Sequence, residues 1–421
     1  CRSFRRITMK FKPFLPILIS GVIFVIFVLL PASWFTGLVT DKTLADNRIS
    51  LTDQVLKGTL IQNKLFESDK YYPIYGSSEL GKDDPFNPGI ALNKHNSSKQ
   101  TFLLGTGGST DLINAVELAS QYDNLKGKKL TFIISPQWFT NHGLTNQNFD
   151  ARMSQTQINQ MFNQKNMPAD LKKRYAQRLL QFPHAHNKPY LREQAKHPGD
   201  VSGNYISAFK ENQLIKIEAI KSLFSFKKPP LAHVKPATKE DASWNEMKDK
   251  AIDIGKANTK SNKFDIRDPY WKLIKENKRK IKRDYEFNID SPEFQDLQLL
   301  VQTLHEAGAD VQYVSIPSNG RWYDHIGIDK DRRESVYKKI HSTVVDNGGK
   351  IYDMTNKDYE KYVISDAVHI GWKGWVYVDQ QIAKHMNGKD PKNHKVDYSK
   401  NQPPNKDHKA HDHHEKKHHE E

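Results

Sequence analysis

The sequence predicts an α/β protein: a three-layer sandwich with a mostly parallel sheet, a helical insertion and one N-terminal transmembrane helix. Three observations lead to this fold class. Short apolar runs typical of buried strands alternate with segments of helical periodicity in two separate parts of the chain. A strongly basic segment separates these parts, and an uncharged apolar run lies near the N-terminus. Because parallel strands are joined by crossovers that usually contain a helix, the alternation favours a parallel sheet covered on both faces.

The composition sets the class of protein. Of 421 residues, 37% are hydrophobic and 27% are charged, which excludes a disordered or fibrous chain and a membrane protein with many spans. The length suits one large domain or two ordinary ones. Lys plus Arg exceed Asp plus Glu by 15, which suggests a partner such as nucleic acid, an anionic membrane surface or a polyphosphate.

The N-terminal apolar run predicts a membrane anchor. Phe14 to Leu30 contains no charge, and about 20 apolar residues at 1.5 Å each cross a hydrocarbon core. Five basic residues precede the run, which places the N-terminus in the cytoplasm and the rest of the chain outside. A cleaved signal peptide is the main alternative, although the run exceeds the usual length of roughly 7 to 15 residues. A buried core helix is a third, disfavoured because no polar face is present.

Cysteine usage agrees with an exported bacterial domain. The only cysteine is Cys1, so the exported part has no disulfide. Exported animal domains often carry such bridges, whereas a large bacterial surface domain can depend on its core alone. We therefore expect a single-pass protein of the cell membrane with its main domain extracellular.

The expected strands and helices follow in order along the two parts. The strands are short and apolar: Tyr72–Tyr75, Thr101–Leu104, Leu130–Ser135, Val311–Ile316 and Ile351–Met354. The helices have apolar residues at helical spacing: Ser109–Gln121, Pro292–Gly308, Arg333–Asn347 and Trp372–His385. The strands and helices therefore alternate before and after the basic segment.

The positive charge is concentrated. Residues 151–286 contain 29 Lys plus Arg against 15 Asp plus Glu, and residues 1–12 add five more positive charges. The two α/β parts are slightly acidic. Lysines scattered over solvated helices would explain the basic segment, and so would a surface that faces anionic lipid or a phosphate polymer. A nucleic-acid partner is disfavoured, because an exported and anchored chain seldom meets one.

Polar and glycine-rich residues follow several predicted strands. In an open parallel sheet, ligands bind outside the carboxyl ends of the strands. The residues there are Gly76–Leu80 (GSSEL) and Gly105–Gly108 (GTGG), with Asp366–His369 (DAVH) in a loop before the last helix. A serine needs a base such as histidine to become a nucleophile, and an acid can orient that base. Backbone N–H groups of the glycine loop can stabilise a developing oxyanion. These are the parts of an acyl-transfer site.

The order of these loops resembles the GDSL or SGNH hydrolases. In that family the nucleophile lies in a Gly-Asp-Ser loop after the first strand, and Asp-x-x-His lies near the end of the fold. The resemblance implies Ser78 as the nucleophile, His369 as the general base and Asp366 as the acid that orients it. Ser77 stands where the family usually has Asp.

The same resemblance implies an oxyanion hole. Its donors would be the amides of Ser78 and Gly107 and the side chain of Gln137, which stands where the broader family commonly has Asn. Trp138 and Trp372 flank the expected site and could line an acceptor groove, although aromatic core packing explains them equally well. We expect no metal ion and no cofactor.

A larger set of motifs resembles the DltD family of Gram-positive bacteria. The set comprises the anchor, VLKGTLIQNKLF, YGSSEL, LGTGGSTDL, ISPQWF and ISDAVHIGWKGW, and the similarity covers approximately residues 10–386. This resemblance implies a role in placing D-alanyl esters on lipoteichoic acid at the outer membrane face. It also implies as partners a membrane O-acyltransferase and a D-alanyl carrier protein with the ligase that charges it.

Several functions remain open at this stage. The serine site can transfer a D-alanyl group to a polyol-phosphate hydroxyl, or it can act as an esterase or thioesterase if water enters. Hydrolysis of a cytosolic carrier thioester is disfavoured, because the site is expected across the membrane from that substrate. A noncatalytic scaffold that recruits the carrier protein or the acyltransferase is the alternative from another class.

The chain is accordingly divided into seven segments. They are a cytoplasmic basic arm (1–12), a transmembrane anchor (13–35), a juxtamembrane connector (36–70), the first part of the α/β catalytic domain (71–150), a basic, mainly helical insertion (151–286), the second part of the catalytic domain (287–386) and a disordered His/Lys-rich tail (387–421). The composition of the tail cannot bury apolar area. Its histidines are either solvated or a loose site for a divalent metal.

Overall fold

The computed structural model describes residues 15–92, 98–199, 205–224, 229–276, 281–389, 393 and 396–403. The predicted basic arm of residues 1–12 lies outside these ranges. Of the predicted tail, residues 387–389, 393 and 396–403 are described, and its last five histidines, from His411 on, lie outside the described residues.

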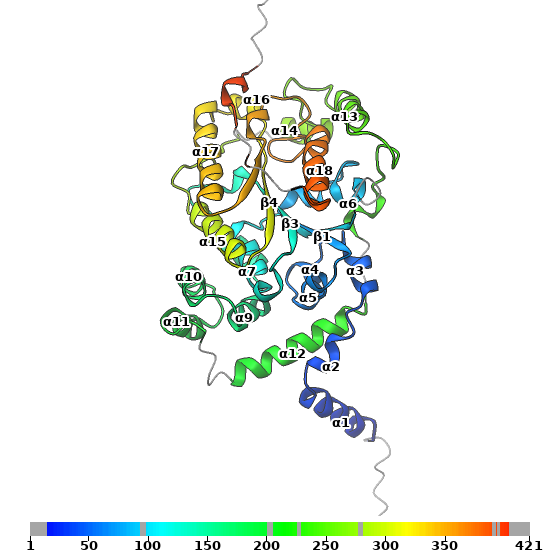
Figure 1. Ribbon diagram of the computed structural model, residues 1–421, viewed down its shortest axis with the longest axis vertical. Coiled ribbons are helices and arrows are strands. Elements are labelled where there is room, and N and C mark those ends of the chain that lie inside the picture. Colours follow the sequence, from blue (N-terminus) through cyan, green and yellow to red (C-terminus); the bar gives the residue numbers. More distant parts are fainter. Residues whose placement is uncertain are drawn as a thin grey trace, which may run out of the picture.

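Five parallel strands form the central sheet, in the order β2-β1-β3-β4-β5 (Figure 1). They are β1 (Tyr71–Gly76), β2 (Gln100–Gly105), β3 (Lys129–Ile134), β4 (Asp310–Ser315) and β5 (Lys350–Asp353). The predicted α/β fold with a parallel sheet is therefore confirmed. Because β2 lies on one side of β1 and all later strands on the other, the strand order reverses beside β1. Ligands of open parallel sheets bind at such a reversal, outside the carboxyl ends of the strands.

Both faces of the sheet are buried. Successive residues of a strand point to opposite faces, so Tyr71 and Tyr75 of β1 enter one apolar core while Tyr72 and Ile74 enter a second. The first core is covered by α7 (Asp111–Ala119), α15 (Glu293–Glu306) and α17 (Lys330–Asp346). The second is covered by α6 (Pro88–Ala91), α13 (Trp244–Asn258) and α18 (Trp372–Met386). These layers make the predicted three-layer sandwich.

The segment between β3 and β4 is mainly helical. Its helices are α8 (Asn146–Arg152), α9 (Gln155–Asn163), α10 (Ala169–Leu179), α11 (Lys188–Lys196), α12 (Tyr205–Lys221), α13, α14 (Asp268–Glu276) and α15. They pack onto the sandwich on both sides, because Tyr175 of α10 belongs to the first core and Ala251 of α13 to the second. The predicted domain boundaries remain predictions.

The remaining elements are short. They are α2 (Ser33–Thr36), α3 (Asp41–Asn47), α4 (Asp53–Leu56), α5 (Leu60–Glu67) and α16 (Gly320–His325), with 3₁₀ turns η1 (Ser78–Gly81), η2 (Tyr122–Asn124), η3 (Pro136–Trp138), η4 (Pro230–His233), η5 (Thr355–Lys357) and η6 (Tyr398–Lys400). The short turns η1 and η3 directly follow the carboxyl ends of β1 and β3. They therefore place the residues after these strands at the edge where the order of the sheet reverses.

The predicted membrane anchor of residues 13–35 is not confirmed. The helix in this segment is α1 (Leu15–Leu29), which has 15 residues. Among the residues that the structure describes, no helix combines the length and the apolar character needed to cross a bilayer.

Candidate active site

The turn after β1 carries the predicted nucleophile. Ser78 is half-buried and begins η1, immediately beyond the carboxyl end of the strand. The turn is tight at two glycines. A Cβ on Gly76 would lie 2.4 Å from Glu79 Oε1, and one on Gly105 would lie 2.5 Å from the Gly76 carbonyl oxygen. Only glycine fits where β1, β2 and the turn approach so closely.

Ser78, His369 and Asp366 form a continuous chain of hydrogen bonds. Ser78 Oγ lies 2.8 Å from His369 Nε2, and His369 Nδ1 lies 2.7 Å from Asp366 Oδ2. Asp366 Oδ1 also accepts the backbone N–H groups of Val368 and His369, each at 2.9 Å. The chain brings together three residues that come from opposite ends of the fold.

The carboxylate of Asp366 stays ionised. Burial alone would raise its pKa, but the hydrogen bond and the charge of His369 and the two backbone N–H groups lower the pKa to about 2. An ionised Asp366 accepts a hydrogen bond from the Nδ1–H group of the imidazole, and Nε2 is then left as the acceptor for the Ser78 hydroxyl. This is the protonation pattern that a serine nucleophile requires.

Asn319 fixes the loop that carries the acid and the base. It follows β4 and donates through Nδ2 to the carbonyl oxygens of Asp366 (3.0 Å) and Phe264 (2.9 Å). Its backbone N–H donates to the carbonyl of Ala367 at 2.9 Å. The motifs did not reveal this residue. Its place in PSNG, directly after a strand at the ligand-binding edge, was the available signal.

A buried network of hydrogen bonds supports the turn that carries Ser78. Ser77 Oγ accepts from Trp138 Nε1 (3.1 Å) and donates to the Thr106 carbonyl (3.3 Å), so it joins the turns after β1, β2 and β3. Glu79 is fully buried and accepts the Ser77 N–H at 2.6 Å and the Ser135 hydroxyl at 3.2 Å. Sequence reasoning assigned Glu79 no part in the active site.

The pKa of the Glu79 carboxyl is raised, because burial outweighs the groups that favour its charged form. Burial raises the pKa of this carboxyl, while the N–H of Ser77 and the nearby charge of His369 act to lower it. A fully buried carboxylate is destabilising unless it is hydrogen-bonded. Its bonds to Ser77 and Ser135 therefore hold the turn in one conformation.

The predicted oxyanion donors lie in two different surroundings. A Cβ on Gly107 would be 3.6 Å from Ser78 Cβ, so this glycine lies directly against the nucleophile. Its carbonyl accepts from Arg152 Nε at 2.8 Å, which fixes the peptide from α8. Gln137 is buried in η3, and its Oε1 has no hydrogen-bond partner among the described residues. The roles of Ser78, Gly107 and Gln137 as donors remain predictions.

The two tryptophans differ in exposure. Trp138 is half-buried and contacts the nucleophile turn through Ser77. Trp372 is 2% exposed, and the guanidinium of Arg267 lies 4.8 Å above its ring. Trp372 therefore belongs to the core of the second face, and its part in an acceptor groove remains a prediction.

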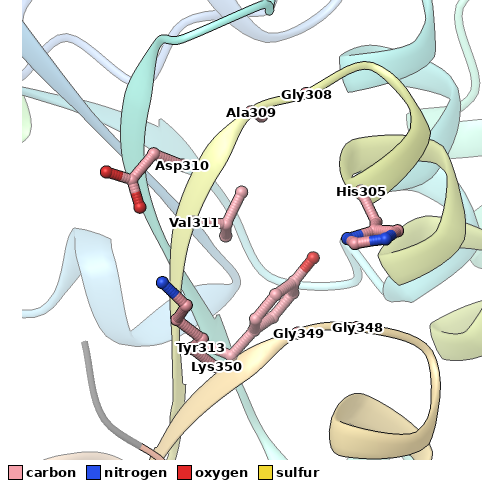
Figure 2. Close-up of a pocket in the computed structure, with 9 residues that line it drawn as sticks. All are labelled: His305, Gly308, Ala309, Asp310, Val311, Tyr313, Gly348, Gly349 and Lys350. Carbon is pink, nitrogen blue, oxygen red and sulfur yellow. The ribbon is translucent and has the colours of Figure 1, made fainter. Parts of the chain in front are cut away.

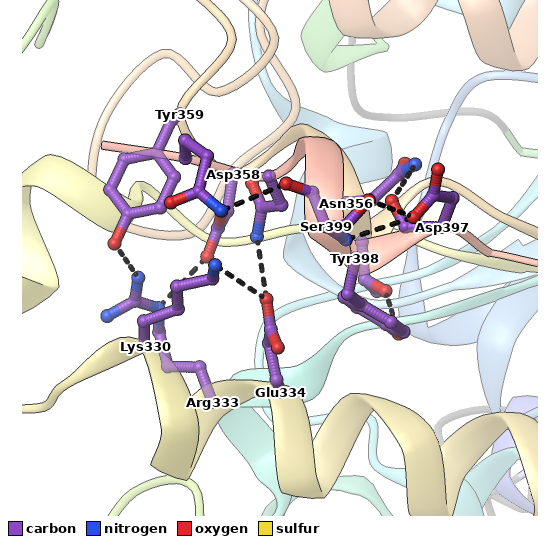
Figure 3. A network of polar contacts seen from close by, with 12 residues as sticks. Lys330, Arg333, Glu334, Asn356, Asp358, Tyr359, Asp397, Tyr398 and Ser399 are labelled. Atoms are coloured by element: carbon purple, nitrogen blue, oxygen red, sulfur yellow. Dashed lines mark hydrogen bonds and ion pairs between the residues drawn. The ribbon is translucent and has the colours of Figure 1, made fainter. Parts of the chain in front are cut away.

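The buried side chain of Arg333 links α17 to the segment that precedes the loop of Asp366 and His369. Arg333 donates to Asp358 Oδ2 (3.0 Å) and to the Tyr359 hydroxyl (3.0 Å) (Figure 3). It also donates to Asp324 Oδ1 (2.7 Å). The backbone carbonyl of Asp358 in turn accepts the N–H of Gly320, which begins α16. The segment that precedes Asp366 is thus held by the ion pairs of Arg333 with Asp358 and Asp324.

A pocket of about 370 Å³ lies at the opposite end of the strands from Ser78 (Figure 2). It is lined by His305, Gly308, Ala309, Asp310, Val311, Tyr313, Gly348, Gly349 and Lys350. Asp310 and Lys350 are the first residues of β4 and β5. The pocket therefore lies at the amino ends of the strands, away from Ser78 at a carboxyl end.

Comparison with known proteins gives the family. The sequence profile of the family described as DltD protein matches residues 48–387. The chain belongs to the DltD family. The range matched to the DltD family includes all five strands of the sheet together with Ser78, Asp366 and His369. It begins after α1 and α2.

Three DltD relatives extend over most of this chain. A protein of Staphylococcus aureus (strain NCTC 8325 / PS 47) named Protein DltD is 81% identical over 380 residues, 90% of this chain and 97% of that protein. Protein DltD of Bacillus subtilis (strain 168) is 34% identical over 385 residues, 89% of this chain and 97% of its own. Protein DltD of Lacticaseibacillus rhamnosus is 27% identical over 379 residues, 87% and 89% of the two chains.

Proposed function

We propose that this chain is a membrane-anchored, extracytoplasmic serine acyltransferase that takes part in the D-alanylation of lipoteichoic acid. Membership of the DltD family supports the pathway. The observation that carries the chemistry is the 2.8 Å contact between Ser78 Oγ and His369 Nε2, continued to Asp366 at 2.7 Å. Such a chain activates a hydroxyl at neutral pH, where serine alone is a poor nucleophile.

The first half-reaction loads the serine. Ser78 Oγ attacks the carbonyl carbon of a D-alanyl ester or thioester while its proton moves to His369 Nε2. Ionised Asp366 stabilises the imidazolium that forms. The tetrahedral oxyanion collapses, the leaving oxygen or sulfur takes the proton from Nε2, and a D-alanyl ester remains on Ser78.

The second half-reaction unloads it. A polyol-phosphate hydroxyl of lipoteichoic acid gives its proton to His369 Nε2 and attacks the ester carbonyl. Collapse of this second oxyanion releases Ser78 Oγ, which recovers the proton from the imidazolium. The amides of Ser78 and Gly107 are the proposed oxyanion donors, with Gln137 as the third. Loss of one such donor typically costs about 3 kcal/mol in the barrier.

The same chemistry with water as the acceptor would make the protein an esterase or thioesterase. Transfer requires that water is kept from the acyl-enzyme while the acceptor hydroxyl is held in place. The proposed donor-side partner is the membrane O-acyltransferase of the pathway. The D-alanyl carrier protein would act indirectly, because its thioester is made on the cytoplasmic side.

The decisive experiment compares Ser78→Ala with Ser335→Ala, which changes an exposed serine on α17. Each variant is expressed in cells that lack the native protein, and ester-linked D-alanine on lipoteichoic acid is measured at matched protein levels. We expect Ser78→Ala to lose the ester-linked D-alanine and Ser335→Ala to retain it. Unchanged D-alanine in Ser78→Ala cells would refute the catalytic role and favour the noncatalytic scaffold.

A labelling experiment tests the nucleophile directly. A fluorophosphonate reagent, which modifies activated serines, is applied to the purified full chain and to both variants. We expect Ser335→Ala to be labelled like the parent and Ser78→Ala to remain unlabelled. Equal labelling of all three proteins would place the reactive serine elsewhere.

A further inference from the structure

Several apolar side chains of α12 are exposed on its outward face. On this helix Phe209 is 51% exposed, Leu214 is 42% exposed and Ile217 is 41% exposed. Leu223 and Phe224, directly after the helix, are exposed by 53% and 50%. A helix at the surface of a soluble domain normally turns its polar residues to solvent and its apolar residues inward. The exposed side of α12 departs from this rule.

Two lysines share that face with the apolar side chains. At 100° per residue, Lys210 and Lys221 fall on the same side of the helix as Leu214 and Ile217, and both lysines are exposed. Apolar residues flanked by lysines are typical of helices that lie in the interfacial layer of a membrane. The apolar side chains enter the lipid there, and the lysine stems extend so that their ammonium groups reach anionic headgroups.

The opposite face of α12 is occupied by the protein itself. Ala219 is fully buried in the first core. Glu218 accepts the backbone N–H groups of Thr59 and Leu60, each at 2.7 Å, and so caps α5 at the edge of the sandwich. A carboxylate at a helix N-terminus is stabilised by the helix dipole. The outward face therefore cannot turn inward without breaking these contacts.

Polar residues of α12 also hold the end of the apolar helix α1. Lys216 Nζ donates to the carbonyl oxygens of Phe27 (2.6 Å) and Leu30 (2.9 Å), and it lies 4.8 Å above the Phe27 ring. Asn212 accepts the backbone N–H of Ala32 at 2.6 Å. The bonds from Lys216 satisfy carbonyl groups that a helix leaves unpaired at its C-terminus, and Asn212 holds the N–H group of the residue before α2. Thus the middle and the second half of α12 lie against the end of α1.

The apolar surface continues from α12 onto α1 and α2. None of the residues of α1 is buried, and Trp34 of α2 is 72% exposed. In Figure 1, α12 lies across the end of the molecule next to α2, with α1 beyond it. A tryptophan at the junction suits the headgroup level of a bilayer, where such rings gather. A lipid bilayer can thus contact the exposed apolar side chains of α1, α2 and α12 together.

We propose that α12 is an interfacial helix that rests in the outer leaflet of an anionic lipid bilayer, with Phe209, Leu214 and Ile217 in the acyl-headgroup boundary. This inference rests on the membrane location in the proposed function and not on its chemistry. The helix spans about 25 Å, at 1.5 Å for each of 17 residues. Lying flat, it would fix the tilt of the sandwich above the membrane, and α1 alone would not.

Site-specific labels on the full chain test this placement. Cys1 is the only cysteine, so Cys1→Ser provides a background without thiols. Single cysteines are then introduced as Phe209→Cys, Leu214→Cys or Ile217→Cys and labelled with an environment-sensitive nitrobenzoxadiazole dye. Val22→Cys reports on α1. Leu273→Cys on α14 is the matched control, because Leu273 is 62% exposed and α14 lies at the other end of the molecule in Figure 1.

The proteins are reconstituted into vesicles of phosphatidylcholine and phosphatidylglycerol that carry nitroxide lipids at a shallow or a deep position. We expect blue-shifted emission and preferential shallow quenching for the three α12 labels, deep quenching for Val22→Cys and neither effect for Leu273→Cys. Replacing Lys210 and Lys221 by Glu should reduce the shallow quenching when phosphatidylglycerol is present. Circular dichroism of each variant verifies the fold.

Two other outcomes overturn the proposal. If the α12 labels behave like Leu273→Cys while Val22→Cys is quenched, α12 does not touch lipid and its face is left for a protein partner. If Val22→Cys also stays aqueous, the membrane location fails as well. Adding Ser78→Ala leaves all these signals unchanged if the two proposals are independent, so the catalytic claim and the docking claim can fail separately.

Discussion

Two groups, each made of an aspartate, a histidine and a hydroxyl, lie at opposite ends of the strands of the same sheet. At the carboxyl ends of the strands the group is Asp366, His369 and Ser78. At the amino ends Asp310 Oδ1 lies 3.1 Å from His385 Nε2, and His385 Nδ1 lies 2.6 Å from the Tyr72 hydroxyl. The distances are similar. The spacing of three polar groups therefore does not by itself identify a catalytic site.

Access from solvent distinguishes them. Tyr72 and His385 are completely buried, whereas Ser78 is half-buried on a turn with glycines on both sides. Burial raises the pKa of Tyr72 and lowers that of His385, so both groups stay neutral at pH 7. Ser78 meets a histidine that an ionised carboxylate supports. A substrate carbonyl can approach Ser78, and Tyr72 is enclosed by the second core.

The largest effect should separate the two hydroxyls. Ser78→Ala is expected to lower acyl transfer by at least about 1,000-fold, because no other atom takes over the attack. Tyr72→Phe should keep transfer within about twofold but lower the free energy of unfolding by about 1–3 kcal/mol, since His385 and Thr131 lose a hydrogen-bond partner. Single-turnover kinetics and urea unfolding measure the two quantities. Equal kinetic losses in both variants would end the distinction.

The two acids should differ in the same direction. Asp366→Asn keeps the size of the side chain but presents the wrong partner to His369 Nδ1, so a loss of about 100- to 10,000-fold in transfer is expected. Asp310→Asn should leave transfer unchanged, because it affects only His385 and Lys129 at the opposite edge. The measurement is kcat/KM with each purified variant. Normal activity of Asp366→Asn would contradict the assigned role.

Glu79 provides a third contrast, between geometry and charge. In Glu79→Ala the Ser77 N–H and the Ser135 hydroxyl lose their acceptor in a buried place, and we expect transfer to fall about 10- to 100-fold. Glu79→Gln retains an oxygen for the Ser77 N–H and should remain within about threefold of the parent. Thermal unfolding controls for general destabilisation. If the two variants lose activity equally, the charge of Glu79 acts in some other way than by positioning the turn.

The smallest effect should appear in the acid stability of the fold. The pKa of His385 is lowered in the folded protein, mainly by burial, so an unfolded chain binds a proton more readily below about pH 6.5. The stability due to His385 is complete above that pH and declines as the pH falls towards its folded pKa. Asp366, whose folded pKa is about 2, keeps its contribution until the pH falls below about 4.

Urea unfolding across this pH range measures the difference. His385→Gln should flatten the dependence just below pH 6.5, and Asp366→Asn should alter it only in stronger acid. If His385→Gln leaves the slope unchanged, His385 is already exposed to protonation in the folded state.

The sequence predicted the elements whose signal is local. The alternation of strands and helices located all five strands, because buried parallel strands read as short apolar runs. Ser78, Asp366 and His369 were found because each lies in a short motif beside a strand or the last helix. Asn319 and Glu79 were not, since their partners, Asp366 and Ser135, are distant in the chain and are brought near only by packing.

No sequence pattern indicated the buried group of Asp310, His385 and Tyr72. Tyr72 and His385 are separated by more than 300 positions, and each looks like an ordinary core residue of a strand or a helix. The exposed face of α12 was also missed, because its apolar residues are interspersed with lysines that made the whole segment look merely basic. Which face turns outward is decided by Ala219 and Glu218, whose contacts depend on the tertiary fold.

The polar network around Arg333 reaches further along the chain than the triad loop. The Tyr398 hydroxyl lies 2.7 Å from Thr355 Oγ1, and Asn401 donates to Glu334 Oε1 at 3.3 Å, so η6 closes over α17. Residues 396–403, assigned to the tail from sequence, thus act as a clasp. A shortened version for crystallisation or tagging should retain residue 403. Ending the protein at residue 387 would expose charged groups that hold the segment before His369 in place.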